Sequence, residues 1–214
     1  MHFLITAGPT REALDPVRYL SNRSSGRMGY ALAGAALRAG HEVTLVTGPV
    51  SLPPQDGVRV IKITSAGEMY DAVRQCLPRC DAAIFAAAVA DYRPATVAPQ
   101  KIKKSGDTLT LVLERTPDIL GSVRGVFQWH GFLTGFAAET ENLMENARGK
   151  LQHKGCDLVV ANDVSRPETG FDSKDNEVTL VWRDGRVEPL PRLAKEDLAN
   201  RLIARITAAA AGRH

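Results

Sequence analysis

The sequence has few cysteines, few aromatic residues and no long hydrophobic run. Its three cysteines, at positions 76, 80 and 156 of 214, are an odd number and do not make a disulfide framework. No apolar run approaches the roughly 18 residues that a membrane span needs. The first apolar segment begins at His2 or Phe3, which leaves no room for a signal peptide. We therefore expect a cytoplasmic protein with no membrane partner.

Charge and histidine content exclude further classes. The formal net charge of +3 is too small to indicate a nucleic-acid partner, although it is compatible with an anionic small molecule. The five histidines are scattered, and neither His-Glu-x-x-His nor a pair of Cys-x-x-Cys motifs occurs, so a zinc site is not expected. At 44% hydrophobic residues, the chain is long enough for one sizeable core.

Short apolar segments alternate with amphipathic ones. Strands are expected at 3–7, 42–47, 58–63, 81–87, 131–138 and 157–161. Helices are expected at 26–39, at 65–77 after a capping box of Ser65 and Glu68, from the Thr116 cap and Pro117 onward, at 141–154 and at 193–211. This order predicts an α/β fold with a doubly wound, mainly parallel, Rossmann-like sheet in three layers.

Two segments do not fit a parallel sheet. Residues 108–113 alternate like a half-exposed strand, and 177–190 reads as a hairpin around Asp184-Gly185. We expect both to form a small antiparallel annex. No linker is long enough to separate two domains, so residues 1–214 are expected to form a single domain.

The segment from Asn22 to Gly29 joins the first strand to the first helix. Small residues at a helix start let backbone N–H groups approach an anion, and the helix dipole favours negative charge there. Ser24 and Ser25 can cap the helix or donate to phosphate oxygens. The segment predicts either an anion site or only a capped helix with close glycine packing.

A dinucleotide-binding function is the obvious alternative for such a fold. Its Gly-x-Gly-x-x-Gly fingerprint must follow the first strand directly, but here Gly8 is followed by a loop over 9–23 and only Gly26-x-x-Gly29 lies near the helix. The second strand ends in Thr47 instead of an acidic residue, and no Walker phosphate loop occurs. A nicotinamide cofactor is therefore not favoured.

Ligands of doubly wound sheets bind beyond the carboxyl ends of the strands. The segments expected there are GPTRE (8–12), DPVRYLSNRSSGRMG (15–29), AAVADYRP (87–94), GFAAET (135–140) and VANDVS (160–165). In this order, and over nearly the whole chain from Thr6 to about Ile206, they resemble phosphopantothenoylcysteine synthetase of the bacterial, CTP-using type. That domain is commonly the C-terminal half of a bifunctional coenzyme A biosynthesis flavoprotein, so the chain is either a stand-alone synthetase or part of such an enzyme.

The resemblance implies a ligase that joins 4′-phosphopantothenate to L-cysteine. CTP, with magnesium, would activate the carboxylate as an acyl-cytidylate with release of pyrophosphate, and the cysteine amine would then displace CMP. The preference for CTP over ATP follows only from the bacterial character of the motifs. The resemblance also implies a homodimer, with contacts that we place on the annex strands, and no flavin in this part. A non-catalytic nucleotide-binding module is the rival hypothesis.

The resemblance assigns residues to each substrate, and it leaves the metal ligands unknown. Lys101 belongs to a flap that closes over the triphosphate, although the residue type alone fits a solvated charge cluster with Lys103 and Lys104. Lys150 and Lys154, four apart on one helix face, would contact CTP, against the alternative of a solvated face. The other residues assigned to CTP are Ala87, Asp91, Pro117, Asp118, Ile119, Leu120 and Phe136.

Asn22 would hold the acyl oxygen during attack by cysteine, an oxyanion role whose alternative is a simple turn residue. Arg18 and Ala88 match positions associated with the same step. The resemblance assigns Ser24, Gly26, Gly29 and Asn162 to phosphopantothenate, and it includes a late loop in which no individual roles are assigned, at Phe171, Asp172, Ser173 and Asn176.

Overall fold

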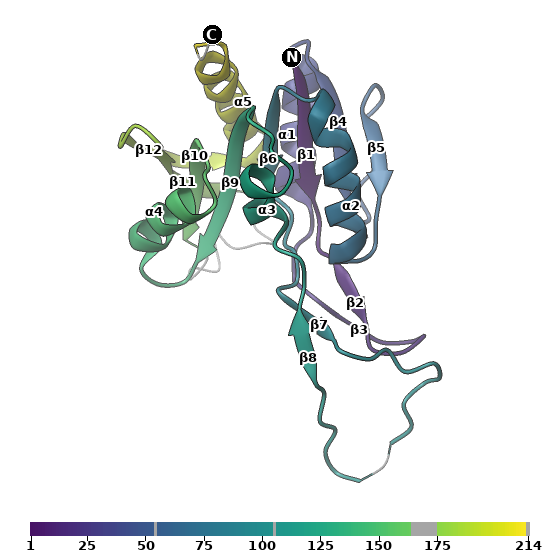
Figure 1. The fold of residues 1–214 in the computed structure, drawn as a ribbon. Coiled ribbons are helices and arrows are strands. Elements are labelled where there is room, and N and C mark those ends of the chain that lie inside the picture. Colours follow the sequence, from purple (N-terminus) through teal and green to yellow (C-terminus); the bar gives the residue numbers. More distant parts are fainter. Residues whose placement is uncertain (54, 105, 164–174, 213–214) are drawn as a thin grey trace.

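An eight-stranded sheet forms the centre of the protein (Figure 1). The computed structural model describes residues 1–53, 55–104, 106–163 and 175–212. The strands lie in the order β12-β11-β10-β9-β6-β1-β4-β5. The six strands β10, β9, β6, β1, β4 and β5 are parallel, and β11 and β12 are antiparallel to their neighbours. Their bounds are β1 His2–Ala7, β4 Glu42–Thr47, β5 Arg59–Lys62, β6 Ala82–Phe85, β9 Phe132–Glu139, β10 Leu158–Asp163, β11 Asp175–Trp182 and β12 Val187–Ala194.

Helices cover both faces of this sheet, which confirms the three-layer prediction. Alternate side chains of β1 point to opposite faces, so Phe3 and Leu4 belong to two separate buried clusters. One cluster contains residues of α1 (Arg27–Arg38) and α5 (Lys195–Ala211). The other contains residues of α2 (Ala66–Cys76), α3 (Ile119–Gly125) and α4 (Leu143–His153), and a short 3-10 helix, η1 (Leu77–Arg79), follows α2. Taken in chain order, the parallel strands have the doubly wound order 3-2-1-4-5-6.

Of two helix caps predicted from the sequence, one is confirmed and one is wrong. Ser65 caps α2, because its Oγ accepts a hydrogen bond from the Glu68 amide at 3.2 Å. The predicted start of α3 at Thr116 and Pro117 is wrong, since the N-cap is Asp118, which accepts from the Gly121 amide at 2.9 Å. Thr116 lies two residues before this cap, and its hydroxyl donates to the carbonyl of Ala90 at 2.6 Å.

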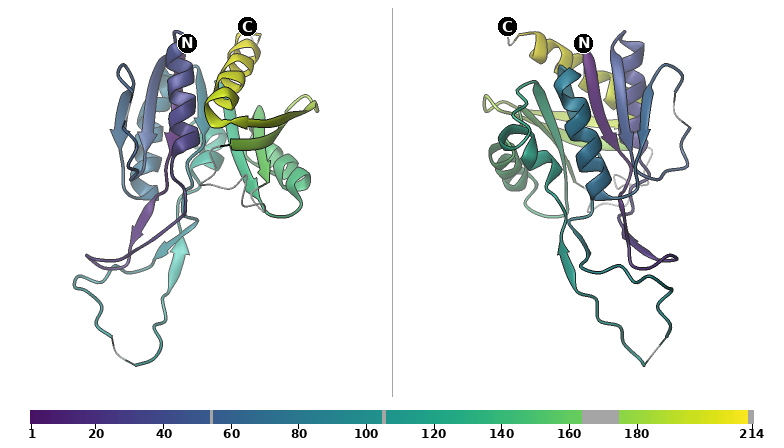
Figure 2. Two further views of the ribbon diagram at one scale, coloured as in Figure 1. Left: turned by 180° about the vertical axis from the view of Figure 1, so that it is seen from behind. Right: turned by 45° about the vertical axis from the view of Figure 1, so that its right-hand side comes forward.

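Two short antiparallel strand pairs project beyond the carboxyl ends of the parallel strands (Figures 1 and 2). They are β2 (Arg11–Ala13) with β3 (Tyr19–Ser21), and β7 (Tyr92–Pro94) with β8 (Leu113–Arg115). We call residues 11–21, 92–104 and 106–115 the arm. The first pair was not predicted, because three-residue strands are too short to produce a hydrophobic pattern.

The two predicted annex segments have different outcomes. The hairpin around Asp184-Gly185 is confirmed, but it extends the main sheet, with Trp182 of β11 opposite Leu158 of β10. The predicted strand at 108–113 is wrong, because only its last residue, Leu113, belongs to β8. Backbone groups of a strand need a partner, and β7 offers only three residues. Among the described residues, no helix is both long and apolar enough to cross a membrane.

Candidate functional site

Two adjoining pockets lie at the carboxyl ends of β1, β6 and β9, where ligands of doubly wound sheets bind. The larger has a volume of about 500 Å³ and the smaller of about 300 Å³. Both are lined by Ala87, Val89, Asp91, Phe136 and Lys150. We call these five residues the common wall, because they border both pockets. Groups bound in the two pockets can therefore meet beside them.

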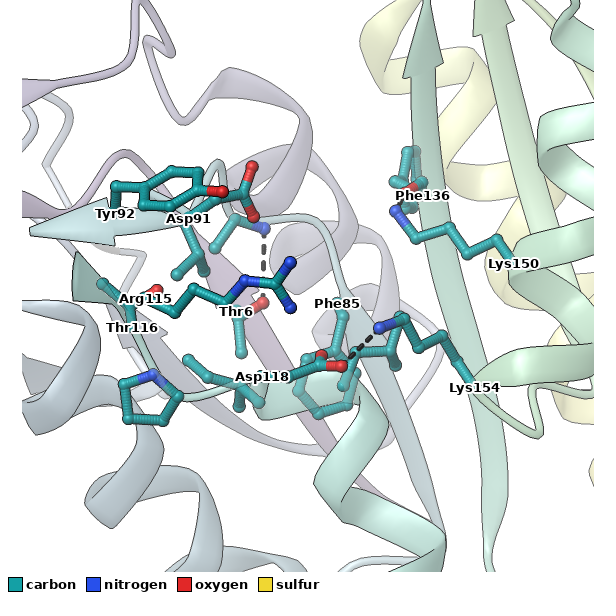
Figure 3. Close-up of a pocket in the computed structure, with 15 residues that line it drawn as sticks. Thr6, Phe85, Asp91, Tyr92, Arg115, Thr116, Asp118, Phe136, Lys150 and Lys154 are labelled. Carbon is teal, nitrogen blue, oxygen red and sulfur yellow. Dashed lines mark hydrogen bonds and ion pairs between the residues drawn. The ribbon is translucent and has the colours of Figure 1, made fainter. Parts of the chain in front are cut away.

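The larger pocket collects the residues that the sequence assigned to CTP, except Lys101 (Figure 3). The α3 start and its preceding turn form one wall, and α4 forms another. Sequence reasoning missed several further lining residues, of which Arg115 and Tyr92 come from the base of the arm. No motif indicated Arg115, because β7 and β8 were not expected to pair, whereas Tyr92 lies in the 87–94 motif but was given no role. The missed residues are Thr6, Phe85, Val89, Tyr92, Arg115 and Thr116.

Lys150 of α4 and Lys154 at its C-cap both line this pocket, but they have different partners. Lys150 donates from Nζ to the carbonyl oxygen of Phe136 at 2.5 Å. Lys154 forms an ion pair with Asp118 across the pocket, which Figure 3 shows as a dashed line. Lys154 is therefore held by the residue that caps α3, and a nucleotide phosphate would compete with that carboxylate for it.

Burial changes the ionisation of Lys150 and Asp118. Desolvation lowers the pKa of the Lys150 ammonium, although the nearby Cys156, Glu139 and Asp91 oppose this shift. Burial alone would raise the pKa of Asp118, but the hydrogen bonds from Lys154 and from the Gly121 amide outweigh it and keep that pKa below its usual range. Asp118 is thus a stable anion, whereas Lys150 loses its proton more easily than a surface lysine.

The smaller pocket lies at the N-terminus of α1. All four residues assigned to phosphopantothenate line it, namely Ser24, Gly26, Gly29 and Asn162. Three charged residues that were given no role also line it. Arg27 and Glu139 lie in the 15–29 and 135–140 motifs, whereas no motif indicated Lys195. Lys195 begins α5 and is only 8% exposed, so a distant helix adds a buried cation to a pocket made mainly by α1 and the strand ends.

Neither Ser24 nor Ser25 caps α1, so the first of the two uses predicted for these serines, capping or donation to a phosphate, is not observed. Gly26 occupies the N-cap position with a φ of 76°, a left-handed conformation that glycine adopts without strain. The Oγ of Ser24 instead accepts a hydrogen bond from the Gly26 amide at 3.3 Å. A Cβ on Gly29 would lie only 2.4 Å from the Cβ of Ala7, so α1 starts directly against the end of β1.

The residues assigned to the cysteine step separate into two places. Asn22 donates from Nδ2 to the carbonyl of Ala88 at 3.0 Å, beside the smaller pocket that Ala88 lines. Arg18 instead contacts Asp15 and donates from Nη2 to the carbonyl of Ile102 at 2.7 Å. Lys101 is exposed and is not among the described residues that line either pocket.

The late loop is only partly described. Phe171, Asp172 and Ser173 lie outside the described residues, whereas Asn176 is buried and lines the smaller pocket. Within the ranges that the structure describes, no three His, Cys, Asp or Glu side chains come together as a metal-binding group.

Comparisons with known proteins identify relatives of the whole chain. Residues 1–210 match the family described as DNA/pantothenate metabolism flavoprotein C-terminal domain. The coenzyme A biosynthesis bifunctional protein CoaBC of Vibrio vulnificus (strain YJ016) is 51% identical over 205 residues, which cover 95% of this chain and 51% of that protein. The same protein of Escherichia coli (strain K12) is 51% identical over 196 residues, 90% of this chain and 48% of that one.

A solved structure gives the same result. The crystal structure of the C-terminal domain of a coenzyme A biosynthesis bifunctional protein CoaBC superposes with a TM-score of 0.83 at 41% identity, and the match covers 97% of this chain and 94% of that one. The chain therefore spans about half the length of the curated relatives it matches, and nearly all of this solved C-terminal domain.

Proposed function

The chain belongs to the family of DNA/pantothenate metabolism flavoprotein C-terminal domains, and from that premise we propose that it joins 4′-phosphopantothenate to L-cysteine at the expense of CTP. One observation carries the proposal: the residues assigned to CTP, apart from Lys101, and those assigned to phosphopantothenate line two different pockets that share a wall. A carboxylate in one pocket can thus reach a phosphate in the other. We propose that residues 1–214 act as one domain, since both pockets are built on the same sheet.

In the first step, a carboxylate oxygen of phosphopantothenate attacks the α-phosphorus of CTP. The bond from that phosphorus to the bridging oxygen breaks, and pyrophosphate leaves with the electron pair. Two anions must approach each other, so the site needs cations that are already in place. Lys150 lies on the common wall and Lys154 in the larger pocket. Lys101 would join them when the arm moves as a unit over the triphosphate.

In the second step, the amine of cysteine attacks the acyl carbon, CMP leaves with the bonding electrons, and the amine loses a proton. The carbonyl oxygen gains negative charge in the transition state and needs a donor. Nδ2 of Asn22 carries two hydrogens, of which one is used by the Ala88 carbonyl, so the second can serve this oxygen. The N-terminus of α1 would hold the phosphate of phosphopantothenate.

Magnesium fits the larger pocket as a companion of the triphosphate. Mg²⁺ is usually held by one or two carboxylates together with substrate phosphates, and it keeps several waters. Asp91 supplies a carboxylate on the common wall, where the α-phosphate would lie. When bound, the ion would neutralise phosphate charge, and Asp91 would orient it.

We also propose that the arm mediates a homodimer. Large apolar side chains on it are exposed, and such a concentration on one projection indicates an interaction site. They are Val97, Leu109, Leu111, Val112 and Leu113. A second copy of the chain suits them, because a twofold arrangement lets the same apolar arm surface cover itself.

Product analysis tests the activity. Incubation with phosphopantothenate, cysteine, CTP and Mg²⁺ should yield CMP and pyrophosphate in equal amounts, and omission of the acid should abolish both. A parallel incubation with ATP tests the nucleotide preference. Release of CDP and phosphate would contradict the acyl-cytidylate route. Tight CTP binding without turnover would favour the non-catalytic nucleotide-binding module.

A further inference from the structure

Asp15 is a fully buried carboxylate in the turn between β2 and β3. Its side chain is 0% exposed. Oδ1 accepts hydrogen bonds from the amides of Val17 and Arg18, both at 2.8 Å. Oδ2 accepts from Nε and Nη2 of Arg18 at 3.0 and 2.6 Å. Such a set of donors exceeds what a turn needs, because the two backbone amides already close it.

The remaining bond of Asp15 reaches the distant segment that carries Lys101. Oδ2 also accepts from the amide of Ile102 at 3.1 Å, and Nη2 of Arg18 donates to the carbonyl of the same residue at 2.7 Å. The Asp15–Arg18 pair therefore binds both main-chain groups of the residue that follows Lys101. We call this arrangement the Ile102 clamp.

The clamp is a fixed point in an otherwise extended, exposed segment. Lys101, Lys103 and Lys104 are exposed, and only Ile102 among these neighbours is partly buried. A second bond, from the Ala98 amide to the Leu14 carbonyl at 3.0 Å, ties the same segment to the same turn. Burial would raise the pKa of Asp15, but the hydrogen bonds from Arg18, Ile102 and Val17 hold that pKa well below its usual range, so the clamp is charged at neutral pH.

We propose that Asp15 is a positioning residue that acts through Arg18 and Ile102 to hold the backbone beside Lys101 in the register needed for the first half-reaction. This inference rests on the proposed function, in which Lys101 neutralises charge at the triphosphate. It also gives Arg18 a second role. The resemblance assigns its guanidinium to the cysteine step, and the same group donates a hydrogen bond to Ile102, next to Lys101 of the activation step. The competing explanation is that Asp15 only stabilises its own turn.

Asp15→Asn is the central variant, because it keeps the shape but replaces one acceptor oxygen by a donor. Hydrogen exchange, measured by NMR, should show the Ile102 amide exchanging about ten- to a hundredfold faster, as expected for a lost bond to a charged group. Asp184→Asn is the matched control. Asp184 makes the same local pattern, accepting from the Arg186 amide at 3.0 Å and from its Nε at 2.7 Å, but in the β11–β12 turn.

A double-mutant cycle tests the functional part. Asp15→Asn should slow pyrophosphate release in the parent by tenfold or more, on the order of a lost positioning contact, but should change little in a Lys101→Gln background, because its effect passes through Lys101. Equal effects in both backgrounds would mean that Asp15 acts on the turn alone and would overturn the proposal. Unchanged exchange at Ile102 would overturn it without any reference to activity.

Two further results separate this inference from the proposed function. If Lys101→Gln releases pyrophosphate like the parent, the proposed role of Lys101 is wrong. The positioning role of Asp15 is then wrong too, even if the Ile102 amide exchanges slowly in the parent and faster in Asp15→Asn. If Lys101→Gln is slow but Asp15→Asn is not, only the inference fails. Should Asp15→Asn not fold, Ile102→Pro removes the same hydrogen bond from the other side and leaves the turn intact.

Discussion

The side-chain amide of Asn22 is hydrogen-bonded to the main-chain carbonyl of Ala88, 66 positions further along the chain, at 3.0 Å. The same carbonyl accepts the amide of Thr10 at 3.3 Å. The turn before α1 is thus fastened to the segment that leaves β6, beside the wall common to both pockets. This bond fixes the direction of the Asn22 amide before any substrate binds, which is what an oxyanion donor requires.

We expect Asn22→Asp to separate the two half-reactions. The carboxylate is nearly isosteric, but it places negative charge where the acyl oxygen must gain it, so attack by cysteine should slow by about a hundredfold or more. Activation should change much less. A single turnover with CTP and phosphopantothenate, quenched and resolved by chromatography, should show acyl-cytidylate that cysteine discharges poorly.

Asn200→Asp provides the control, since Asn200 lies on α5 and its Oδ1 only accepts from Arg38 at 3.0 Å. Equal loss of both steps in Asn22→Asp, or a rate like that of the parent, would make Asn22 a turn residue.

Lys101→Gln should slow pyrophosphate release by about a hundredfold, because the variant keeps much of the length but loses the charge at the triphosphate. The effect is measured as the rate of pyrophosphate formation before cysteine is added. Lys103→Gln removes the same charge from the same exposed segment and should be nearly silent. Equal effects of the two variants would support the solvated charge cluster instead.

CTP binding should be linked to protonation of Lys150. Burial lowers the pKa of the free lysine, whereas a bound triphosphate favours its charged form and raises that pKa again. Between the two values, binding takes up a proton, and CTP affinity falls as the pH rises through the lowered pKa. Calorimetry in buffers of different ionisation enthalpy measures this uptake.

Lys150→Arg should abolish the proton uptake, since guanidinium stays charged, whereas Lys154→Arg should retain it. Absence of uptake in the parent would contradict the assignment of Lys150 to the phosphates.

Gly29→Ala should destabilise the protein by about 1–3 kcal/mol, the usual cost of overpacking. Its Cβ would lie 2.4 Å from that of Ala7, and 3.1 Å from the carbonyl oxygen of Thr6. Urea denaturation measures the free energy of unfolding. Gly149→Ala is the matched control within α4: its Cβ would meet only Nδ1 of His153, at 4.0 Å, so the helix should gain roughly 0.5–1 kcal/mol. A stable Gly29→Ala would show that α1 can move away from β1.

Val112→Glu should weaken the proposed homodimer. Val112 is 74% exposed on the arm, and burying one valine contributes about 1.5 kcal/mol or more, so the dimer dissociation constant should rise at least about tenfold. Sedimentation equilibrium measures it. Val126→Glu is the control, because Val126 is 66% exposed but lies after α3, away from the arm. A parent chain that stays monomeric at high concentration would rule out the dimer.

Most of the sheet and its helices could be predicted because their patterns are local. Buried runs such as Phe3 to Ala7 have the composition of central parallel strands. The Ser65–Glu68 capping box indicates the start of its helix within four consecutive residues. The start of α3 could not be read in this way. Thr116 looks like a cap in sequence, but its hydroxyl is used by the distant Ala90 carbonyl, which only the folded arm brings close.

The candidate site shows the same difference between residues that a local sequence pattern indicates and residues that only the fold brings together. Residues that the resemblance assigned to a substrate, such as Asp118 and Asn162, line one of the two pockets, whereas Arg115 and Lys195 were missed. Both missed cations come from elements outside the motifs, and only the pairing of β7 with β8 and the docking of α5 bring them to the strand ends. A charged residue contributed by an element distant in sequence has no fixed spacing from the motifs, so the sequence alone does not indicate it.

The wall that the two pockets share has a consequence for inhibition. A single molecule with a nucleotide at one end and a pantothenate-like acid at the other could fill both pockets. Its middle part would lie beside Ala87, Asp91 and Phe136, which line both. Once one end is bound, the other faces its pocket at an effective concentration in the millimolar range. Such a bisubstrate compound should therefore bind far more tightly than either half, and the acyl-cytidylate, which has the same shape, should be retained and shielded from hydrolysis until cysteine arrives.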